Sequence, residues 1–329
     1  MHTHPRPLTL AIVGTGFIAQ DLLSALETIP DVRAISLCAR PHSRQKAEAL
    51  AQAHGISQVY TDYDALLQTD TADFVYIGLV NTAHYVYTKK ALLAGRHVIL
   101  EKPFVMTGVE ACELKALAAE KHVYLIEAVT CLHMPNFKLL QQACAQIGQV
   151  RVVQANYSQY SSRYDRYLKG EVLPAFNPEL GGGALMDLND YNLNLLVALF
   201  GKPQTGQYIA NRGFNGVDTS GAAILHYPHF FATSVAAKDS ASPSFFLVQG
   251  ERGWVRVHGA PNVLTSVTVC LDGKEITHNE NQYAHRMVHE FMEFARMYRE
   301  QDTANFAQSL RTSIDVVETL EMLRTSSLS

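Results

Sequence analysis

A glycine-rich turn near the amino end places the strongest constraint on the fold of this chain. The segment LAIVGTGFIAQDLLSAL, residues 10–26, leads from an apolar, β-branched stretch through Gly14 and Gly16 into a helical pattern that contains Ala19. In a G-x-G-x-x-G/A turn, the first glycine makes the tight bend and the second lets the backbone approach a pyrophosphate at the helix amino end. The small third residue permits close packing. The alternative is an ordinary strand-to-helix turn, but the context favours dinucleotide binding.

Short apolar runs alternate with helical patterns through the rest of the first third of the chain. Strands are expected at residues 8–13, 34–38, 74–77, 98–100 and 124–126. Runs of this length between amphipathic segments are typical of βαβ units and a parallel sheet. Gly55 and Gly95 are predicted to follow helix ends, because glycine accepts the left-handed backbone there. The pattern therefore predicts an α/β, doubly wound nucleotide-binding domain.

The pattern changes after about residue 128. Strand-like runs joined by Gly, Asn, Pro or Asp turns fill residues 148–158 and 207–278, which predicts a mostly antiparallel sheet. Two final segments, residues 283–301 and 304–323, have helical periodicity and are expected to cover a face of one sheet. We therefore expect a nucleotide-binding domain over residues 1–127 and an α+β domain over residues 128–329.

Composition favours an ordinary globular protein with a small-molecule partner. The 329 residues are 47% hydrophobic and 18% charged, and the formal charge of −4 comes without Lys/Arg-rich blocks, which argues against nucleic acid as a partner. The amino end has neither a signal-peptide nor a membrane-span pattern, so the cytoplasm is expected and a membrane partner is not.

Cysteine and histidine spacing predicts neither disulfides nor a metal site. The five cysteines lack CxxC spacing and are expected to be small buried hydrophobes in a reducing compartment: Cys38, Cys112, Cys131, Cys144 and Cys270. His285 and His289 form an i,i+4 pair, but no HExxH pattern surrounds them, so solvated or interface histidines are expected.

The end of the second predicted strand bears on the choice of cofactor. NAD sites usually have Asp or Glu there to bind the ribose 2′-hydroxyl, whereas AISLCARPHSRQK, residues 34–46, has Arg40, with Ser43 and Arg44 just beyond. Because an arginine can pair with a 2′-phosphate, NADP(H) is favoured over NAD(H). The alternative is that Arg40 stacks on the adenine or extends into solvent.

A second charged motif lies at the end of another predicted strand. In ILEKPF, residues 99–104, Glu101 and Lys102 precede Pro103, which ends the strand. Both charges are then held at the edge where open α/β sheets bind ligands. A solvated Glu–Lys pair is the alternative for an isolated dipeptide.

These motifs, together with LGGGALMDLNDYNL at residues 180–193, resemble those of the Gfo/Idh/MocA oxidoreductases, over nearly the whole chain. The resemblance implies a Rossmann domain and a C-terminal domain with a large open sheet that often makes the oligomer contact, so a homodimer or homotetramer is expected. It also implies hydride transfer between NAD(P) and a secondary alcohol or ketone of a sugar, polyol or dihydrodiol. An NAD-dependent glycosidase and a non-catalytic nucleotide-sensing regulator of the same architecture remain alternatives.

By the same resemblance, Lys102, Asp187 and Tyr191 are the expected catalytic residues. The step from Asp187 to Tyr191 puts both side chains on one face of a helix. Oxidation of an alcohol needs a base for the hydroxyl proton, and a tyrosine serves only with a cation nearby, which Lys102 is expected to supply. Tyr191 matches the branch that resembles dihydrodiol and xylose dehydrogenases. The family commonly has glycine where this chain has Asn189.

Further residues are expected to bind the cofactor and the substrate. The cofactor residues are Gly14, Thr15, Gly16, Phe17, Ile18, Arg40, Ser43, Arg44, Leu79, Asn81, His84, Glu101 and Lys102. The long polar and aromatic segment of residues 157–183 offers Arg163, Tyr164 and Phe176 as substrate contacts, with a structural or interface loop as the alternative.

Overall fold

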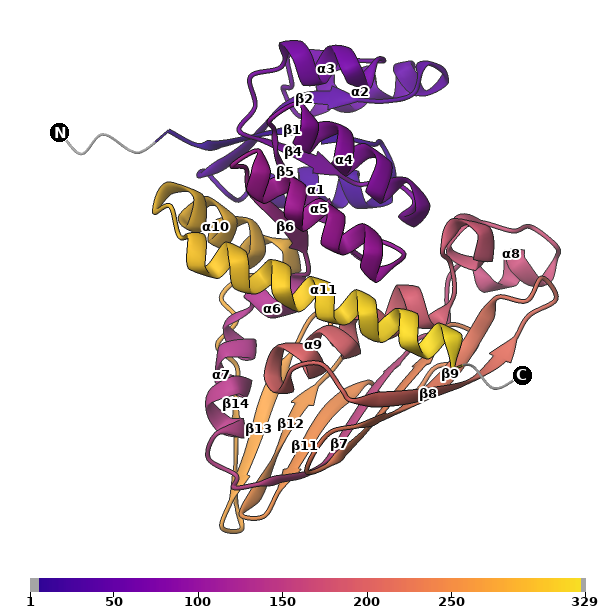
Figure 1. Cartoon of the computed structure of the whole chain (residues 1–329), viewed down its shortest axis with the longest axis vertical. Coiled ribbons are helices and arrows are strands. Elements are labelled where there is room, and N and C mark those ends of the chain that lie inside the picture. The colour runs from indigo at the N-terminus through magenta and orange to yellow at the C-terminus, as the bar shows by residue number, and fades with distance from the viewer. Residues whose placement is uncertain (1–5, 327–329) are drawn as a thin grey trace. The chain divides into compact units, whose positions relative to one another are not determined.

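The computed structural model describes residues 6–326, which form two compact units (Figure 1). The first unit takes in the described residues up to Val105, together with Val109–Ala128 and Met287–Arg311. The second unit takes in Met106–Gly108, Val129–Arg286 and the described residues from Thr312 onward.

A parallel six-stranded sheet forms the centre of the first unit, with the order β3-β2-β1-β4-β5-β6. The strands are β1 (Leu8–Val13), β2 (Val32–Cys38), β3 (Gln58–Tyr60), β4 (Phe74–Ile77), β5 (His97–Glu101) and β6 (Leu125–Ala128). This order is that of the Rossmann dinucleotide-binding fold, so the predicted doubly wound sheet is confirmed. Every residue of β1 is buried, as expected for a central parallel strand.

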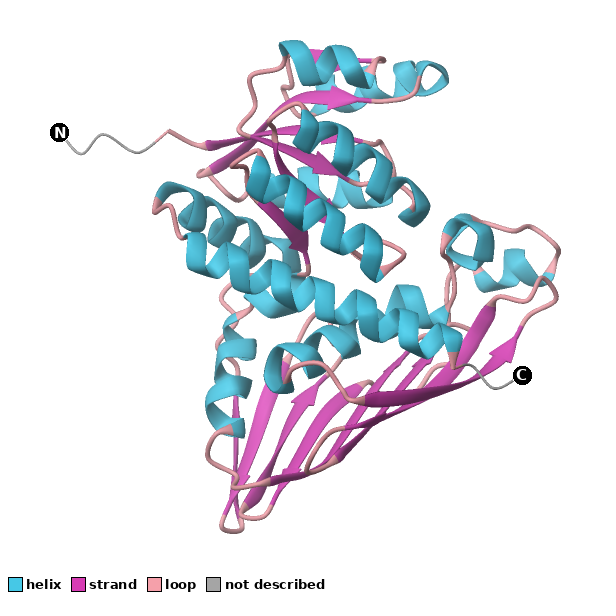
Figure 2. Ribbon diagram, in the orientation of Figure 1, coloured by secondary structure: helices cyan, strands magenta, loops and turns pink. Residues whose placement is uncertain are grey.

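Helices connect these strands (Figure 2). They are α1 (Phe17–Leu26), η1 (Pro41–Ser43), α2 (Arg44–Ala53), α3 (Tyr63–Thr69), η2 (Asn81–Ala83), α4 (His84–Leu93) and α5 (Gly108–Glu120). Gly55 and Gly95 follow the ends of α2 and α4 with φ of +64° and +71°, which confirms their predicted role.

One helix of the first unit comes from far along the chain. In α10 (Arg286–Arg299), Met287 and Phe291 join the apolar core that contains Tyr76 of β4, and the Phe291 and Tyr76 ring centres lie 6.0 Å apart. The sequence-based division had assigned this helix to the second domain. The structure differs because the apolar face of α10 packs with the core of the first sheet.

The second unit is built on an eight-stranded sheet with the order β14-β13-β12-β11-β7-β10-β9-β8. The strands are β7 (Val150–Ser158), β8 (Thr205–Arg212), β9 (Asp218–His226), β10 (Phe231–Ala237), β11 (Phe245–Gly250), β12 (Gly253–His258), β13 (Ser266–Leu271) and β14 (Lys274–His278). Only β7 and β10 pair in parallel, so the predicted large, mostly antiparallel sheet is confirmed.

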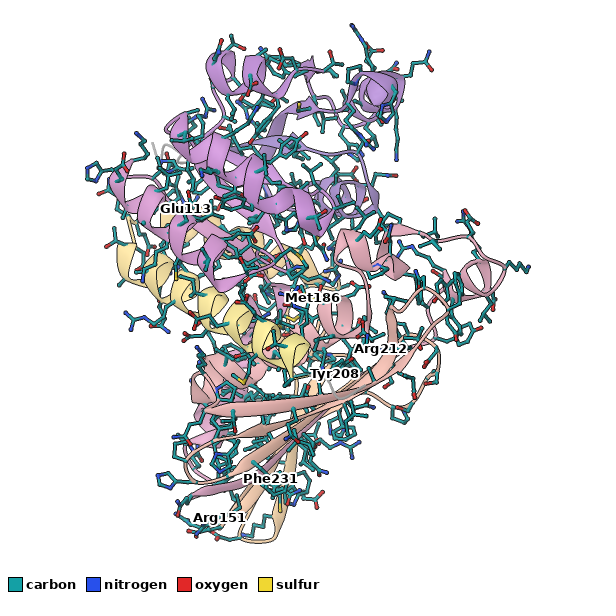
Figure 3. The ribbon with its side chains drawn as sticks, turned by 45° about the vertical axis from the view of Figure 1, so that its right-hand side comes forward. Glu113, Arg151, Met186, Tyr208, Arg212 and Phe231 are labelled. Atoms are coloured by element: carbon teal, nitrogen blue, oxygen red, sulfur yellow. The ribbon has the colours of Figure 1, made fainter. Side chains whose placement is uncertain are left out.

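Helices pack on one face of this sheet, and the opposite face is exposed. The helical elements are α6 (Thr130–His133), α7 (Pro135–Cys144), α8 (Tyr164–Leu168), η3 (Pro174–Phe176), η4 (Pro178–Leu180), η5 (Leu185–Asn189), α9 (Asp190–Phe200) and α11 (Thr303–Thr325). Leu193 of α9 and Leu320 of α11 share one apolar core with Val248 of β11. Residues of the opposite face stay exposed, among them Phe231 at the start of β10 (Figure 3).

All five cysteines are free thiols. Cys38, Cys131 and Cys270 are buried as expected, but Cys112 is exposed on α5, contrary to the expectation. Burial raises the pKa of Cys38 to about 12. Of the two expected environments for His289, solvated or at an interface, the solvated one is wrong, because only 8% of this residue is exposed and burial lowers its pKa. No helix among residues 6–326 has both the length and the apolar character needed to cross a membrane.

Candidate active site

The nucleotide turn begins at Gly14, directly after β1. Its φ of +116° is a conformation that residues with a side chain rarely adopt, and a Cβ at this position would lie 2.4 Å from the carbonyl oxygen of Gly78. The Gly14 N–H also donates to the carbonyl oxygen of Cys38 at 2.9 Å, and the Gly78 N–H donates to Val13 at 3.0 Å. Only glycine therefore fits at position 14, because Gly78, directly after β4, lies too close to leave room for a side chain.

Gly16 has the opposite environment. It is exposed, and a Cβ built on it would meet no atom within 4 Å. The helix α1 that follows has no side-chain cap and no acidic residue in its first turn, so its amino end keeps open N–H groups and the positive end of the helix dipole. Ala19 is completely buried, which allows close packing. The turn therefore fits the diphosphate of a dinucleotide.

The predicted 2′-phosphate residues differ in their availability. Arg44 pairs with Glu48 through Nε and Oε1 at 2.7 Å, and Ser43 is half-buried at the end of η1. Arg40 is exposed just after β2, and within residues 6–326 no side chain pairs with its guanidinium. Of the two arginines, Arg40 is the one that can take an anionic group without breaking an existing ion pair.

Glu101 and Lys102 lie at the carboxyl end of β5, as predicted. The Tyr76 hydroxyl donates to Glu101 Oε1 at 2.6 Å, and only 6% of Glu101 is exposed, so this carboxylate is anchored to the neighbouring strand β4. Lys102 is half-buried, and its peptide bond to Pro103 is cis. The pair is therefore not a solvated dipeptide.

His84 is completely buried at the start of α4. Its Nδ1 lies 2.9 Å from the carbonyl oxygen of Pro103, and its Nε2 lies 3.2 Å from that of Leu79. Burial lowers the pKa of the imidazole, and the positive charge of Lys102 adds to this. In this structure His84 ties the loop after β4 to the residues that follow Lys102, and its direct contact with a cofactor stays a prediction.

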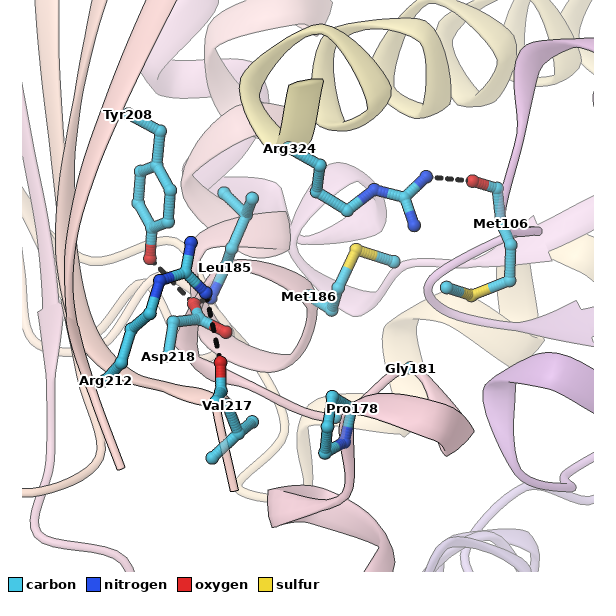
Figure 4. Close-up of a pocket in the computed structure, with 12 residues that line it drawn as sticks. Met106, Pro178, Gly181, Leu185, Met186, Tyr208, Arg212, Val217, Asp218 and Arg324 are labelled. Carbon is cyan, nitrogen blue, oxygen red and sulfur yellow. Dashed lines mark hydrogen bonds between the residues drawn. The ribbon is translucent and has the colours of Figure 1, made fainter. Parts of the chain in front are cut away.

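The glycine run before α9 is explained by one carboxylate of the second sheet. Gly183 has a φ of +125°, and a Cβ there would lie 1.9 Å from Asp218 Oδ1. Asp218 Oδ2 accepts from the Leu185 N–H at 2.7 Å and from the Tyr208 hydroxyl at 2.7 Å (Figure 4). Asp218 therefore caps the helical segment that begins at Leu185. Burial raises the pKa of Asp218.

The predicted catalytic helix begins as a π-helical turn, η5, and continues as α9. The four-residue step from Asp187 to Tyr191, which is predicted to put both side chains on one helical face, crosses from this π-helical turn into the α-helix. The wider turn at Asp187 is of a kind often found at functional sites. The Asp187 side chain keeps 34% of its surface exposed. Tyr191 is 6% exposed, and its ring packs edge-on against Tyr157 of β7 with centres 5.9 Å apart.

Asn189, where glycine is usual in the family, is accommodated by hydrogen bonds. It is completely buried, and its Oδ1 accepts from Asn192 Nδ2 at 2.9 Å and from the Ser234 hydroxyl. Asn192 Nδ2 also donates to the carbonyl oxygen of Val235 at 3.0 Å. The helix is thereby bonded directly to β10.

Sequence reasoning missed Lys238, the residue after β10. Its Nζ donates to Asp187 Oδ2 at 2.8 Å and to the carbonyl oxygen of Ala175 at 2.6 Å. A lysine at the end of the otherwise apolar run FFATSVAAK was the available signal.

The predicted substrate residues lie in different environments. Arg163 is exposed, Tyr164 is half-buried and Phe176 is completely buried. The Phe176 ring stacks on Tyr167 with centres 4.9 Å apart and packs with Val217, so it belongs to a small aromatic core of this loop. Their contact with substrate stays a prediction.

A cavity of about 200 Å³ in the second unit lies beside the start of the same helix (Figure 4). Its lining includes Leu185, Met186 and Asp218, together with the arginines Arg212 and Arg324. Neither Asp187 nor Tyr191 lines it. Within residues 6–326 no group of three or more His, Cys, Asp or Glu side chains is arranged to hold a metal ion.

The open glycine turn on a Rossmann sheet, with a tyrosine and a half-exposed carboxylate on a helix of the second unit, defines the class of nicotinamide-dependent oxidoreductases. The model of the oxidoreductase family with NAD-binding Rossmann fold matches residues 8–129, and the GFO/IDH/MocA C-terminal domain matches residues 140–256. The chain belongs to the Gfo/Idh/MocA family, as its motifs indicated, and is an NAD(P)-dependent oxidoreductase.

Individual relatives agree with this membership. The chain is 35% identical to scyllo-inositol 2-dehydrogenase (NADP(+)) of Bacillus subtilis, over 75% of both chains. It is 29% identical to human trans-1,2-dihydrobenzene-1,2-diol dehydrogenase, over 76% of this chain and 74% of that one. In fold it is similar to a 3-ketoreductase from Actinomadura kijaniata in complex with NADP and TDP-benzene, with a TM-score of 0.82, 22% identity and 98% of both chains covered.

Proposed function

We propose that this chain transfers a hydride between NADP(H) and a secondary alcohol or ketone of a sugar, polyol or diol, with Lys102, Asp187 and Tyr191 as its catalytic residues. The observation that carries the proposal is the helix of the second unit on which a partly exposed carboxylate, Asp187, precedes a buried tyrosine by four residues. The names of the curated relatives, an inositol dehydrogenase and a dihydrodiol dehydrogenase, support this substrate class.

The roles of the residues follow from acid–base chemistry. A bound nicotinamide supplies hydride acceptance or donation at the substrate carbon. Tyr191 takes the hydroxyl proton during oxidation and returns it during reduction. Lys102 is proposed to bind the substrate oxygen and to supply the positive charge that a tyrosine needs to act as a base. Asp187 accepts a hydrogen bond from the substrate and orients it.

The central test is an absorbance screen at the reduced-nicotinamide band with NADP and NAD. The panel contains scyllo-inositol, D-xylose, D-glucose and trans-cyclohexane-1,2-diol. We expect Lys102→Met and Tyr191→Phe to lower kcat at least about 100-fold, because each removes a group used in the proton transfer. NADPH affinity, measured by fluorescence titration, should change less than about threefold in Tyr191→Phe. Wild-type turnover in Lys102→Met would refute the catalytic assignment.

The same screen separates the alternative functions. An NAD-dependent glycosidase would release the aryl group from an aryl glycoside without a net change in NADPH absorbance. A nucleotide-sensing regulator would bind NADPH and turn over none of the panel. Net reduction of NADP by a polyol or sugar excludes both alternatives.

The preference for NADP(H) is proposed on Arg40, which is exposed and forms no ion pair among residues 6–326. The Bacillus subtilis relative named for NADP(+) supports it. Arg40→Asp should weaken NADPH binding about 10- to 100-fold, the loss of one charge-assisted contact, and leave NADH binding nearly unchanged. Arg33→Asp makes the same charge change at the opposite end of β2 and is the control. Equal effects of both variants would show that Arg40 does not contact the phosphate.

We also propose that the exposed face of the second sheet binds a second copy of the chain. Ile209, Ile224 and Phe231 lie on this face and are 59%, 54% and 46% exposed, and they belong to the adjacent strands β8, β9 and β10. Light scattering should show a dimer or tetramer that Ile224→Asp dissociates. Ile276→Asp on β14, an isoleucine 58% exposed on the opposite face, is the control. A monomeric wild type would refute the proposal.

A further inference from the structure

Lys238 is a rigidly held and almost completely buried cation. Its side chain is 2% exposed. Its N–H donates to the carbonyl oxygen of Thr219 at 2.8 Å, and its carbonyl oxygen accepts from the Ser161 N–H at 2.9 Å. The backbone at this position is therefore fixed from two sides, by the neighbouring strand β9 and by the loop after β7.

The buried ammonium has three neighbours that compensate its charge. Nζ donates to Asp187 Oδ2 at 2.8 Å and to the carbonyl oxygen of Ala175 at 2.6 Å, and it lies 4.6 Å from the centre of the Phe176 ring. The Lys238–Asp187 pair is asymmetric, because the lysine is 2% exposed and the carboxylate 34% exposed. Asp187 can therefore meet a ligand, whereas Lys238 holds it from inside the protein.

The same ammonium lies near the second carboxylate on which this helix depends. Burial raises the pKa of Asp218, which caps the helix at Leu185, and the positive charge of Lys238 opposes this rise. Lys238 is thus hydrogen-bonded to the carboxylate that the helix presents, Asp187, and its charge also acts on Asp218, the carboxylate that caps the helix start.

Stability alone does not account for a lysine at this position. Replacing a buried ion pair by apolar residues of similar volume is often neutral or stabilising, whereas removing one partner leaves an uncompensated charge. A catalytic role does account for it, because a lysine that holds the Asp187 carboxylate in place would keep it aligned with the substrate. A small misplacement of a catalytic group can cost about 100-fold in rate.

We propose that Lys238 is a positioning residue for the reaction: its hydrogen bond to Asp187 directs the carboxylate at the substrate, and Lys238 does not contact the substrate itself. This inference rests on the proposed function, because Asp187 is its target. It also assigns Phe176, predicted as a substrate contact, to the support of the Lys238 ammonium.

The test compares kcat and KM in Lys238→Met, Asp187→Asn and the double variant, with the panel compound that is turned over fastest. Lys238→Met should lower kcat at least about 10-fold and leave the KM for NADP(H) within about twofold of wild type. The double variant should have the kcat of Asp187→Asn alone, because the lysine acts only through that carboxylate. Lys274→Met, an exposed lysine on β14, is the matched control and should behave as wild type.

The outcomes separate this inference from the proposed function. Full activity of Asp187→Asn would refute the catalytic role of Asp187. A loss in Asp187→Asn together with wild-type kcat in Lys238→Met would refute only the role of Lys238. If Lys238→Met does not fold, the double variant buries no unpaired charge and can be compared with Asp187→Asn instead. A kcat well below that of Asp187→Asn would then show that Lys238 does not act through Asp187.

Discussion

The two glycines of the nucleotide turn differ in whether the protein has room for a side chain at their position. Gly14 has a φ of +116° and would place a Cβ 2.4 Å from Gly78, whereas a Cβ on Gly16 would meet no atom within 4 Å. Gly14→Ala should therefore lower the melting temperature and weaken NADPH binding together. Gly16→Ala should keep the wild-type melting temperature and weaken NADPH binding at least about 10-fold, because its Cβ would occupy the space of the diphosphate. Calorimetry and fluorescence titration measure the two effects, and tight NADPH binding by Gly16→Ala would contradict the assignment.

The buried His84 is expected to make the free energy of unfolding depend on pH. Burial holds its folded-state pKa below the ordinary value of 6.5, so below that pH the unfolded chain takes up a proton that the buried ring does not. The free energy of unfolding should therefore decline as the pH falls from 6.5 towards the folded-state pKa, by at most about 1.4 kcal/mol per pH unit from this group. His84→Gln keeps an amide that can bond the loops and should lack this share of the slope.

Urea unfolding at several pH values measures both proteins. The half-buried His97 and the buried His289, whose pKa values burial also lowers, contribute equally to wild type and variant, so the difference between the two slopes isolates His84. Identical slopes would show that the imidazole is solvated.

The residues that sequence reasoning found and missed differ in the range of their contacts. Gly14, Gly16 and Lys102 belong to short motifs whose geometry is local. Asp218 and Lys238 act on residues 33 and 51 positions away, Leu185 and Asp187, and no spacing rule connects them. Such partners become visible only when the second sheet brings β9 and the end of β10 to the helix.

At the scale of elements, the helix of the second unit has glycines of different kinds at its two ends. Gly183 before it has a φ of +125° and would place a Cβ 1.9 Å from Asp218 Oδ1, whereas Gly201 after it has a φ of +78° with no atom within 4 Å. Gly201→Ala should cost about 1–3 kcal/mol of backbone strain, because a φ of +78° with a ψ of −174° is a conformation that essentially only glycine adopts. Gly183→Ala should cost at least about 2 kcal/mol more, because Asp218 would also have to leave the Leu185 N–H. Chemical denaturation measures both, and equal losses would contradict the capping role of Asp218.

The predicted elements were most accurate where burial imposes a strong pattern. Leu8–Val13 and Phe74–Ile77 were predicted to the residue, because apolar runs of central parallel strands stand out. The strand Gln58–Tyr60 was missed: it has one exposed and two half-buried residues at a sheet edge and carries no such pattern. The π-helical turn of Leu185–Asn189 was also missed, because apolar spacing does not distinguish it from an α-helical turn.

At the scale of the whole molecule, the first unit depends on a helix that follows residues 129–286 of the second unit in the sequence. Phe291 of α10 packs against Tyr76, and Tyr298 packs edge-on against Phe74 with ring centres 5.2 Å apart. A chain of residues 6–128 should therefore expose this apolar surface, bind a hydrophobic dye and unfold without a cooperative transition. Joining residues 287–311 to it through a long Gly/Ser linker should restore cooperative melting and NADPH binding. Cooperative unfolding of residues 6–128 alone would show that α10 is dispensable.

This discontinuity also has a consequence for synthesis on the ribosome. The six strands of the first sheet emerge early, yet the apolar core that they share with α10 lacks Phe291 and Phe294 until those residues have been translated. Residues 129–286 of the second unit are translated before Phe291 and Phe294 complete that core. A nascent chain of this kind offers a chaperone an apolar target for much of its translation, and a stop codon shortly before α10 would leave a polypeptide that cellular proteases remove.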